Sequence, residues 1–310
     1  MKNYKKILPL FSIILLAVLL YFSDLPNVLG VLSGARLVLI PTAVLLLLVS
    51  ILFRVMKWKL FLNNLEINST WRDCFYSYMP ALFLSNFTPA RIGEPVRSYF
   101  LKKIKGVSIS KTMPSIIMER ALDMLGLVVL SIFILFTFNL GYAVYADVFL
   151  IIFIIVAGIF LLRNEGFSRK VFNTVFRIFS FHSKFKSAES RKEEVGRKFH
   201  AGFKIKKRVL SLVFVLAILV WMCEGLIFYV SFLSLGIELH PILIISIFAF
   251  SVLMGVITFL PGGIGSMEFV FALILSNYIP LPQATAGIIL GRFLTFWLIM
   301  FIASVFWRKV

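Results

Sequence analysis

The sequence predicts an all-α integral membrane protein with six transmembrane helices and two re-entrant helical hairpins. Three observations lead to this fold class: the chain is 60% hydrophobic, its mean hydropathy is +0.99, and its apolar runs reach about 20 residues. A helix of that length crosses the ~30 Å of hydrocarbon in a bilayer. A soluble protein of this composition would expose apolar patches that soluble monomers avoid. We therefore treat residues 1–310 as a single membrane domain.

Six apolar runs are long enough to be predicted as full crossings. They are residues 7–22, 37–53, 115–138, 148–162, 209–235 and 285–306. The first run follows a basic start, as a signal peptide would, but no small-residue cleavage site comes after it, so we expect a retained helix. Two further apolar segments, residues 75–105 and 241–278, are broken by proline and glycine.

The charges predict the orientation of the chain. The formal net charge is +18, and the segment 163–208 alone holds fourteen Lys or Arg against four Glu, a net charge of +10. Basic residues also mark the N-terminus, residues 54–59 and residues 308–309. Lys and Arg collect in cytoplasmic loops, where they face anionic lipid, so we expect both termini in the cytoplasm of a plasma-membrane protein and no nucleic-acid partner.

The two broken segments resemble each other. The stretch FTPARIG at residues 87–93 aligns without gaps on FLPGGIG at residues 259–265, with four identities in seven and an offset of 172. A glutamate follows each final glycine, as Glu94 and Glu268. Proline and glycine interrupt helices, and a break inside hydrocarbon is tolerated where protein or water covers the backbone.

We expect each broken segment to be a re-entrant hairpin, the first entering from the cytoplasm and the second from outside. Residues 1–140 then run from inside to outside and residues 141–310 run back, with the basic loop 163–208 in the second half. This inverted repeat is a transporter architecture, in which the substrate site lies where the broken helices meet. The alternative is that both segments are ordinary extramembrane loops.

The stretch MERALDMLG begins the third predicted crossing and carries three charges. Glu119 and Asp123 are four residues apart and share a helical face, and Arg120 is placed to pair with Asp123. Ionisable residues at membrane depth are functional candidates by default. The alternative is a solvated helix start, where acidic residues favour the helix dipole.

Glu224 lies fifteen residues into the fifth predicted crossing, ~22 Å deep at about 1.5 Å per residue. No basic residue lies within one turn on its helix, so we expect a partner on another element, with Arg292 as the natural candidate. The alternative is a neutral carboxyl group bonded to a backbone carbonyl.

The hairpin tips supply further candidates. Arg91 and Arg97 flank Glu94, and a half-helix starting near Gly93 would add a positive helix end, a combination that suits an anion. Glu268 is placed to receive a cationic group or a proton. The alternatives are that the arginines anchor the cytoplasmic side and that the PGGIG stretch is a plain turn.

The stretches RIGEPVRSYFL, MERALDMLG and LPGGIGSME resemble the lysylphosphatidylglycerol synthase transmembrane-region, or flippase-like, family. The resemblance implies a membrane domain that moves lipid between leaflets; the aminoacyl-transferase domain of the best-known members does not follow in this chain, so no synthase activity is expected. Motif residues carried over from the family are Arg91, Gly93, Glu94, Arg97, Glu119, Arg120, Asp123, Pro261, Gly262, Gly263, Gly265 and Glu268. Glu224 and Arg292 are added for their predicted burial.

The favoured function is an ATP-independent flippase for an anionic or aminoacylated phospholipid or a polyprenyl-linked lipid. No P-loop motif occurs, no paired aspartates suit Mg²⁺, and the three histidines and two cysteines are scattered, so we expect no cofactor, no metal and no enzyme. The alternatives are a membrane-embedded lipid-modifying transferase and a non-transporting partner of a glycosyltransferase. The sequence leaves open the lipid, the direction of movement, the coupling ion and whether the chain forms a homo-oligomer.

Overall fold

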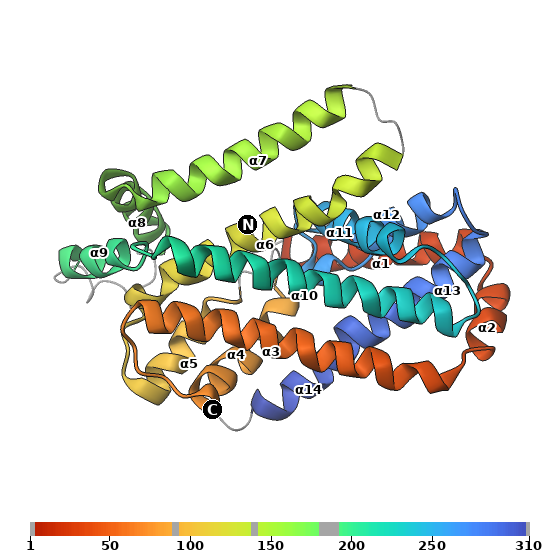
Figure 1. The fold of residues 1–310 in the computed structure, drawn as a ribbon, viewed down its shortest axis with the longest axis horizontal. Helices are drawn as coiled ribbons and strands as arrows, with labels where there is room; N and C mark the ends of the chain where they lie inside the picture. Colours follow the sequence, from red (N-terminus) through yellow and green to blue (C-terminus); the bar gives the residue numbers. More distant parts are fainter. Residues whose placement is uncertain (1–3, 89–92, 138–141, 180–191, 308–310) are drawn as a thin grey trace.

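The computed structural model describes residues 4–88, 93–137, 142–179 and 192–307 (Figure 1). Within these ranges the regular structure is helical, and no strand occurs. Helices satisfy their backbone hydrogen bonds internally, which suits long runs of apolar side chains in a membrane. The all-α prediction is confirmed for the described part of the chain.

The described residues before 140 form seven helical elements. They are α1 (Tyr4–Phe22), α2 (Leu25–Ser33), the 3-10 turn η1 (Leu37–Leu39), α3 (Ile40–Asn64), α4 (Trp71–Asn86), α5 (Val96–Lys105) and α6 (Ile109–Thr137). The elements that follow are α7 (Tyr142–Arg163), α8 (Glu165–Phe179), α9 (Lys192–Ala201), α10 (Lys207–Ser234), α11 (Pro241–Ile257), the 3-10 turn η4 (Pro261–Gly263), α12 (Ser266–Leu275), α13 (Leu281–Arg292), the π-helical turn η5 (Phe293–Trp297) and α14 (Leu298–Trp307).

Three stretches of described helix are long and apolar enough to cross a membrane, namely Leu37–Asn64, Lys207–Ser234 and Leu281–Phe306. The pair Ile14–Phe22 and Leu25–Ser33, bent by 80°, would make a fourth. These spans indicate a multi-pass membrane protein. The expected total of six crossings stays a prediction.

Helix α2 occupies a segment that the sequence analysis treated as a connecting loop. Asp24 adopts a left-handed conformation with φ 55°, which turns the chain sharply after α1. Pro26 then stands in the first turn of α2, where the missing backbone N–H costs no intrahelical bond. The bend therefore follows from two local residues, although neither one alone predicts a helix.

Each broken segment contains two helices in place of one, α4 and α5 in the first and α11 and α12 in the second. The start of α4 is tied to the end of α5, since Lys105 Nζ lies 2.9 Å from Asp73 Oδ2, so these two helices form an antiparallel hairpin. Helices α11 and α12 also pack against each other. In the second turn, Phe259, Gly262, Gly263 and Gly265 all have positive φ, which explains why no helix continues through it.

The two broken segments approach from opposite ends of the molecule. In Figure 1, α4 and α5 lie toward the end that carries α8 and α9, while α11 and α12 lie toward the end that carries α2. Helix α4 contacts η4, so the two breaks meet. A Cβ atom placed on Gly262 would come 3.2 Å from the carbonyl oxygen of Asn86, which is the last residue of α4.

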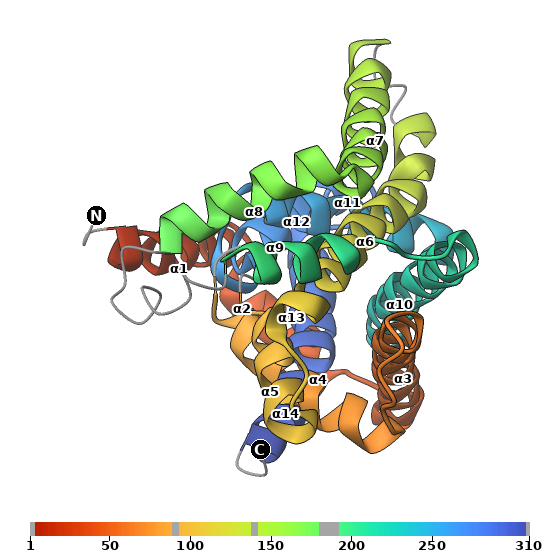
Figure 2. The ribbon, with the colours of Figure 1, turned by 90° about the vertical axis from the view of Figure 1, so that its left-hand side faces the viewer.

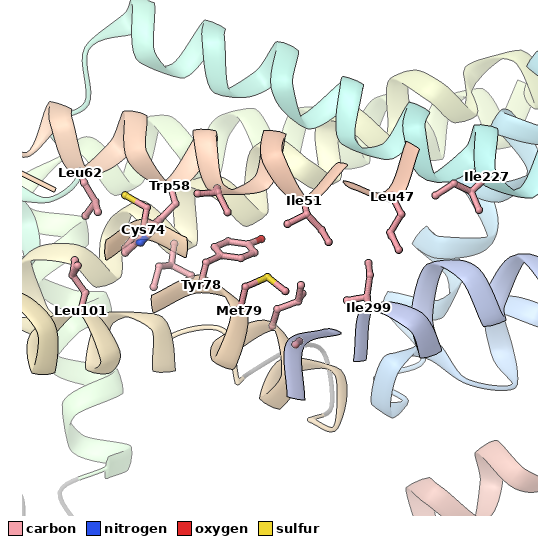
Figure 3. Close-up of a cluster of buried hydrophobic side chains, with 14 of the residues drawn as sticks. Leu47, Ile51, Trp58, Leu62, Cys74, Tyr78, Met79, Leu101, Ile227 and Ile299 are labelled. Carbon is pink, nitrogen blue, oxygen red and sulfur yellow. The ribbon is translucent and has the colours of Figure 1, made fainter. Parts of the chain in front are cut away.

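Helices α3 and α10 lie side by side and pack extensively against each other (Figure 1). One apolar cluster joins α3 to α4, α5, α10 and α14, with Trp58, Tyr78 and Ile299 among its members (Figure 3). A second cluster joins α10, α11, α12 and α13. Each broken segment therefore packs into a different apolar cluster.

Helices α8 and α9 lie within the basic segment 163–208. In Figure 2, α8 runs across the end of α7 instead of continuing it. Phe172 of α8 packs against Phe199 of α9, and both belong to an apolar cluster that includes Phe61 of α3. The segment predicted as a basic loop therefore contains two helices that cover one end of the molecule.

Candidate functional site

Six charged side chains form one chain of alternating ion pairs. In order along that chain they are Arg97, Glu119, Lys57, Asp123, Arg120 and Glu94. They come from α3, α5, α6 and the turn before α5. Three cations thus compensate three anions, as buried charges require.

Helix α6 organises this chain of charges because its three ionised residues occur within five positions. Lys57 Nζ of α3 lies 3.2 Å from Glu119 Oε1 and 2.5 Å from Asp123 Oδ1. Arg120 Nη2 lies 2.5 Å from Asp123 Oδ2 on the same helix. The predicted shared face of Glu119 and Asp123 and the predicted Arg120–Asp123 pair are both confirmed.

Two residues of the first hairpin connect it to α6. Arg97 Nη2 lies 2.6 Å from Glu119 Oε2, and Arg120 Nε lies 2.8 Å from Glu94 Oε2. The guanidinium of Arg97 also lies over the rings of Trp58, at 4.3 Å, and Tyr78, at 5.3 Å. Arg97 is therefore a buried cation inside the protein rather than a cytoplasmic anchor.

Arg54 and Lys57 are the functional candidates that the sequence analysis missed. Residues 54–59 have the pattern of a cytoplasmic boundary, but Arg54 is 2% exposed and Lys57 is fully buried. The available signal was that apolar residues continue after them as far as Leu62, so α3 does not end at Phe53. Their spacing of three also places them on one helical face.

Glu224 pairs with Arg54 of α3, and not with Arg292 as predicted. Helices α3 and α10 lie side by side, which brings these two buried side chains together. The guanidinium of Arg54 also lies 5.4 Å from the ring centre of Trp221, one turn before Glu224. The prediction of a partner on another helix was right, while the identity of that partner was wrong.

Arg292 instead pairs with Glu268 in the second broken segment. The second carboxylate oxygen of Glu268 accepts a hydrogen bond of 2.7 Å from the backbone N–H of Gly265, which caps the start of α12. Arg292 Nη2 donates to the carbonyl oxygen of Gly262 at 3.0 Å. These bonds fix the Pro261–Gly263 turn against Arg292, the last residue of α13. The π-helical turn η5 begins at the next residue, and π-helical turns are often found at functional sites.

A cavity of about 180 Å³ lies between α6 and the second broken segment, beside the turn η4 that contacts α4. Its charged lining residues are Arg120 from the first half and Arg292 from the second. The remaining lining residues are glycines or apolar: Met124, Val252, Gly255, Val256, Leu260, Gly262, Gly263 and Met267. A smaller cavity of about 40 Å³ borders Arg54, Glu224 and Arg292, so Arg292 lines both spaces.

Arg120 and Arg292 occupy matching positions in the two halves. The offset of 172 that aligns the FTPARIG and FLPGGIG stretches also places Arg120 on Arg292. Each arginine stands on the helix that follows a broken segment, and each pairs with the glutamate just after that break. The sequence contained this correspondence, but the structure shows why it matters, because both arginines line one cavity.

The remaining predicted site residues lie at the turns. Gly93 sits against the end of α4, since a Cβ atom there would come 2.9 Å from Ser85 Cα. Its backbone N–H donates to Thr88 Oγ1 at 2.8 Å, which closes the first turn. Arg91 lies outside the described residues. Among the described residues no group of three or more His, Cys, Asp or Glu side chains could hold a metal ion.

The sequence matches the family described as the lysylphosphatidylglycerol synthase TM region over residues 9–303. It is 30% identical to a UPF0104 membrane protein of Pyrococcus horikoshii, over 96% of this chain and 94% of that protein. It is also similar to a UPF0104 membrane protein of Methanothermobacter thermautotrophicus, with 23% identity over 96% of this chain and 93% of the relative. A third relative, from Methanocaldococcus jannaschii, is 24% identical over 82% of this chain and 79% of its own length.

Proposed function

Because the chain belongs to the lysylphosphatidylglycerol synthase TM-region family, we propose that it is a carrier that moves lipid headgroups between membrane leaflets without ATP. The observation that carries this proposal is the cavity between α6 and the second broken segment, where arginines from both halves stand among apolar walls. A headgroup in the cavity would meet compensating charge while its acyl chains stay in hydrocarbon. The barrier to crossing is the cost of moving a charge through hydrocarbon, and such a site lowers that cost.

The proposal includes an inverted repeat of residues 1–140 and 141–310. It is supported by matching contacts. In the proposed repeat, α4 corresponds to α11 and α14 corresponds to the end of α6, so the packing of α4 on α14 matches the packing of α11 on α6. The common offset of 172 for the turn motif and for the arginines supports the same relation. The second hairpin lines the cavity, and the first is joined to the lining residue Arg120 through Glu94, so movements of the two hairpins from opposite ends could open it alternately to either side.

The test is headgroup translocation in proteoliposomes that contain phosphatidylglycerol with a fluorescent label on one acyl chain near the headgroup. Dithionite added outside bleaches the label in the outer leaflet, so a flippase bleaches more than half of it. We expect faster loss in vesicles with the wild-type protein than in empty vesicles. Arg292→Gln should slow the loss about tenfold or more, since a charge-assisted hydrogen bond to the headgroup contributes on the order of 1.5–3 kcal/mol.

Arg169→Gln is the matched control, because it removes the same charge from an exposed i,i+4 pair on α8. It should translocate lipid at the wild-type rate. Mass spectrometry of the recovered lipid should return unmodified phosphatidylglycerol, as expected for a carrier. Wild-type vesicles that flip no faster than empty ones would reject the carrier, and a chemically altered lipid would favour a transferase.

A further inference from the structure

Arg54 and Glu224 form a buried ion pair that the proposed lipid path does not use. Both residues line the smaller cavity of about 40 Å³, and neither lines the larger one that carries the proposed function. The other polar side chains in the smaller lining are those of Asn86, Trp221, Arg292 and Thr295. A carboxylate at membrane depth is a functional candidate by default, and this one lies beside a polar cavity.

The smaller cavity has the volume and the polar lining to hold water. One water molecule needs ~10–15 Å³ of such a cavity and several polar partners, so about 40 Å³ holds a few. Among the described residues, the hydrogen bond to Glu224 runs from Arg54 to Oε1, which leaves Oε2 for water. Asn86 donates from Nδ2 to Met300 Sδ, a weak acceptor, at 3.1 Å. Water in this cavity therefore has polar partners and reaches a carboxylate.

Few other groups near Glu224 can take up or release a proton. The titratable side chains near the ion pair come from four helices and are Tyr78 of α4, Asp123 of α6, Cys223 of α10 and Arg292 of α13. Helix α11 and the turns η1 and η5 also pack on α10, and they contain no titratable side chain. Among the residues that line the smaller cavity, Glu224 is the acid.

The buried ion pairs of the described residues leave no net charge. Those whose side chains are at most 22% exposed join five cations to five carboxylates, namely Arg54, Lys57, Arg97, Arg120 and Arg292 to Glu94, Glu119, Asp123, Glu224 and Glu268. An anionic headgroup in the larger cavity adds a negative charge to this balance, where an uncompensated charge is costly. Uptake of one proton by a carboxylate restores neutrality.

Glu224 is the best placed of the five carboxylates to take up this proton. Glu119 and Asp123 each contact two or more cations, so protonation would weaken more than one ion pair. Glu268 accepts a backbone hydrogen bond in addition to its ion pair, and neither Glu268 nor Glu94 lines either of the two cavities. Glu224 contacts one cation and lines a cavity that holds water.

We propose that Glu224 is a proton-binding site that couples proton movement to headgroup movement. Oε2 accepts a proton from cavity water when the carrier opens to one side and returns it to water after the headgroup has crossed, so the O–H bond is the one bond formed and broken. Arg292 lines both cavities, which links the opening of the larger one to the smaller one. The inference rests on the proposed carrier function and adds its coupling ion. Proton and anionic headgroup each favour the binding of the other, and they travel together.

The test follows lipid and protons in the same proteoliposomes. The full chain is reconstituted in phosphatidylcholine with the pH dye pyranine inside, and valinomycin with equal potassium on both sides holds the membrane potential at zero. Phosphatidylglycerol with a short fluorescent acyl chain is added outside, and albumin extracts the part that stays in the outer leaflet. Inward movement of this lipid should acidify the lumen, with one proton for each lipid. Empty vesicles give the background for both signals.

Glu224→Gln should separate the two signals, because glutamine has the shape of the protonated acid and does not titrate. Lipid movement should stay above that of empty vesicles, while acidification should fall to their rate. The double variant Arg54→Gln/Glu224→Gln guards against loss of fold, since it leaves no buried charge unpaired, and it should behave in the same way. Glu238→Gln makes the same change at an exposed residue after α10, and it should acidify the lumen as the wild-type protein does.

The outcomes separate this inference from the carrier function. Lipid that moves in wild-type vesicles without acidification would overturn the coupling and leave the carrier intact. Acidification at the wild-type ratio to lipid in Glu224→Gln or in the double variant would overturn Glu224 as the proton site. Loss of lipid movement in both variants would also overturn it, because a group that only carries the proton is not required for headgroup passage at zero potential. Wild-type vesicles that move no lipid would reject the carrier and the coupling with it.

Discussion

Lys57 is fully buried and lies between two carboxylates, those of Glu119 and Asp123. A charge removed from water is stable only when partners replace its hydration, and here both partners sit on one face of α6. The same logic applies to Arg54 and Glu224 between α3 and α10. These residues therefore fix the relative positions of α3, α6 and α10 as well as the charge balance beside the cavity.

Lys57→Met should destabilise the protein strongly. The change leaves Glu119 and Asp123 buried without the cation that bridges them, and breaking a buried pair in this way costs about 3–5 kcal/mol. Thermal unfolding in detergent should show a large drop in the midpoint. The control Lys198→Met, which breaks the exposed pair with Glu194, should change stability by about 1 kcal/mol or less. Equal effects of the two substitutions would contradict the buried network.

A double-mutant cycle tests the corrected partner of Glu224. The combined effect of Arg54→Gln and Glu224→Gln on stability should differ from the sum of the single effects by about 0.5–3 kcal/mol, because the residues form one ion pair. The cycle of Glu224→Gln with Arg292→Gln should give the smaller coupling. The reverse ranking would restore the pairing that the sequence predicted.

The residue scale also shows what a single sequence can and cannot predict. Glu224 and Asp123 stand out because an acid in an apolar run needs compensation. Their partners depend on which helices become neighbours, so Arg292 was chosen for Glu224 by apparent depth and proved wrong. Arg54 and Lys57 were overlooked because a basic pair after an apolar run has the same pattern as a membrane boundary.

At the scale of elements, the two breaks were predictable because proline and glycine interrupt an apolar pattern in a visible way. Helix α2 was not, since its nine residues lie within a short segment that also fits a loop. The contact between α10 and α13 was also invisible in sequence, although it explains a pair of glycines. Gly287 and Gly291 face Phe232 and Phe228, whose rings lie where a Cβ atom would be.

Gly287→Ala should separate α10 from α13. The added methyl group would lie 2.1 Å from the ring of Phe232, so a helix or the ring must move, at a cost of about 1–3 kcal/mol. Gly158→Ala in α7 is the control, since no atom lies within 4 Å of its Cβ position and alanine favours a helix. Thermal unfolding should show a loss for the first variant and no loss for the second. A stability loss confined to Gly158→Ala would contradict this packing.

At the scale of the whole molecule, the cavity brings together side chains from both halves of the sequence. The hairpin formed by α4 and α5 and the pair α11 and α12 lie toward opposite ends in Figure 1, and they meet where α4 contacts η4. The turn η4 lines the cavity together with Arg120 and Arg292. Composition and charge alone predicted a multi-pass membrane protein. They could not predict the shared cavity, because it depends on how two halves separated by 172 positions pack together.

The most direct measurement of the central claim is lipid flipping by a protein whose cavity can be closed and reopened. Met124→Cys on α6 and Val256→Cys on α11 place thiols on two walls of the cavity without changing any charge. A bifunctional methanethiosulfonate that bridges them through two disulfide bonds, with release of methanesulfinate, should reduce translocation to the rate of empty vesicles, and cleavage of the disulfides by dithiothreitol should restore it. The wild-type protein, whose Cys74 and Cys223 are buried, should keep its rate after the same treatment. A bridged protein that flips lipid as fast as the unbridged one would show that headgroups do not pass through this cavity.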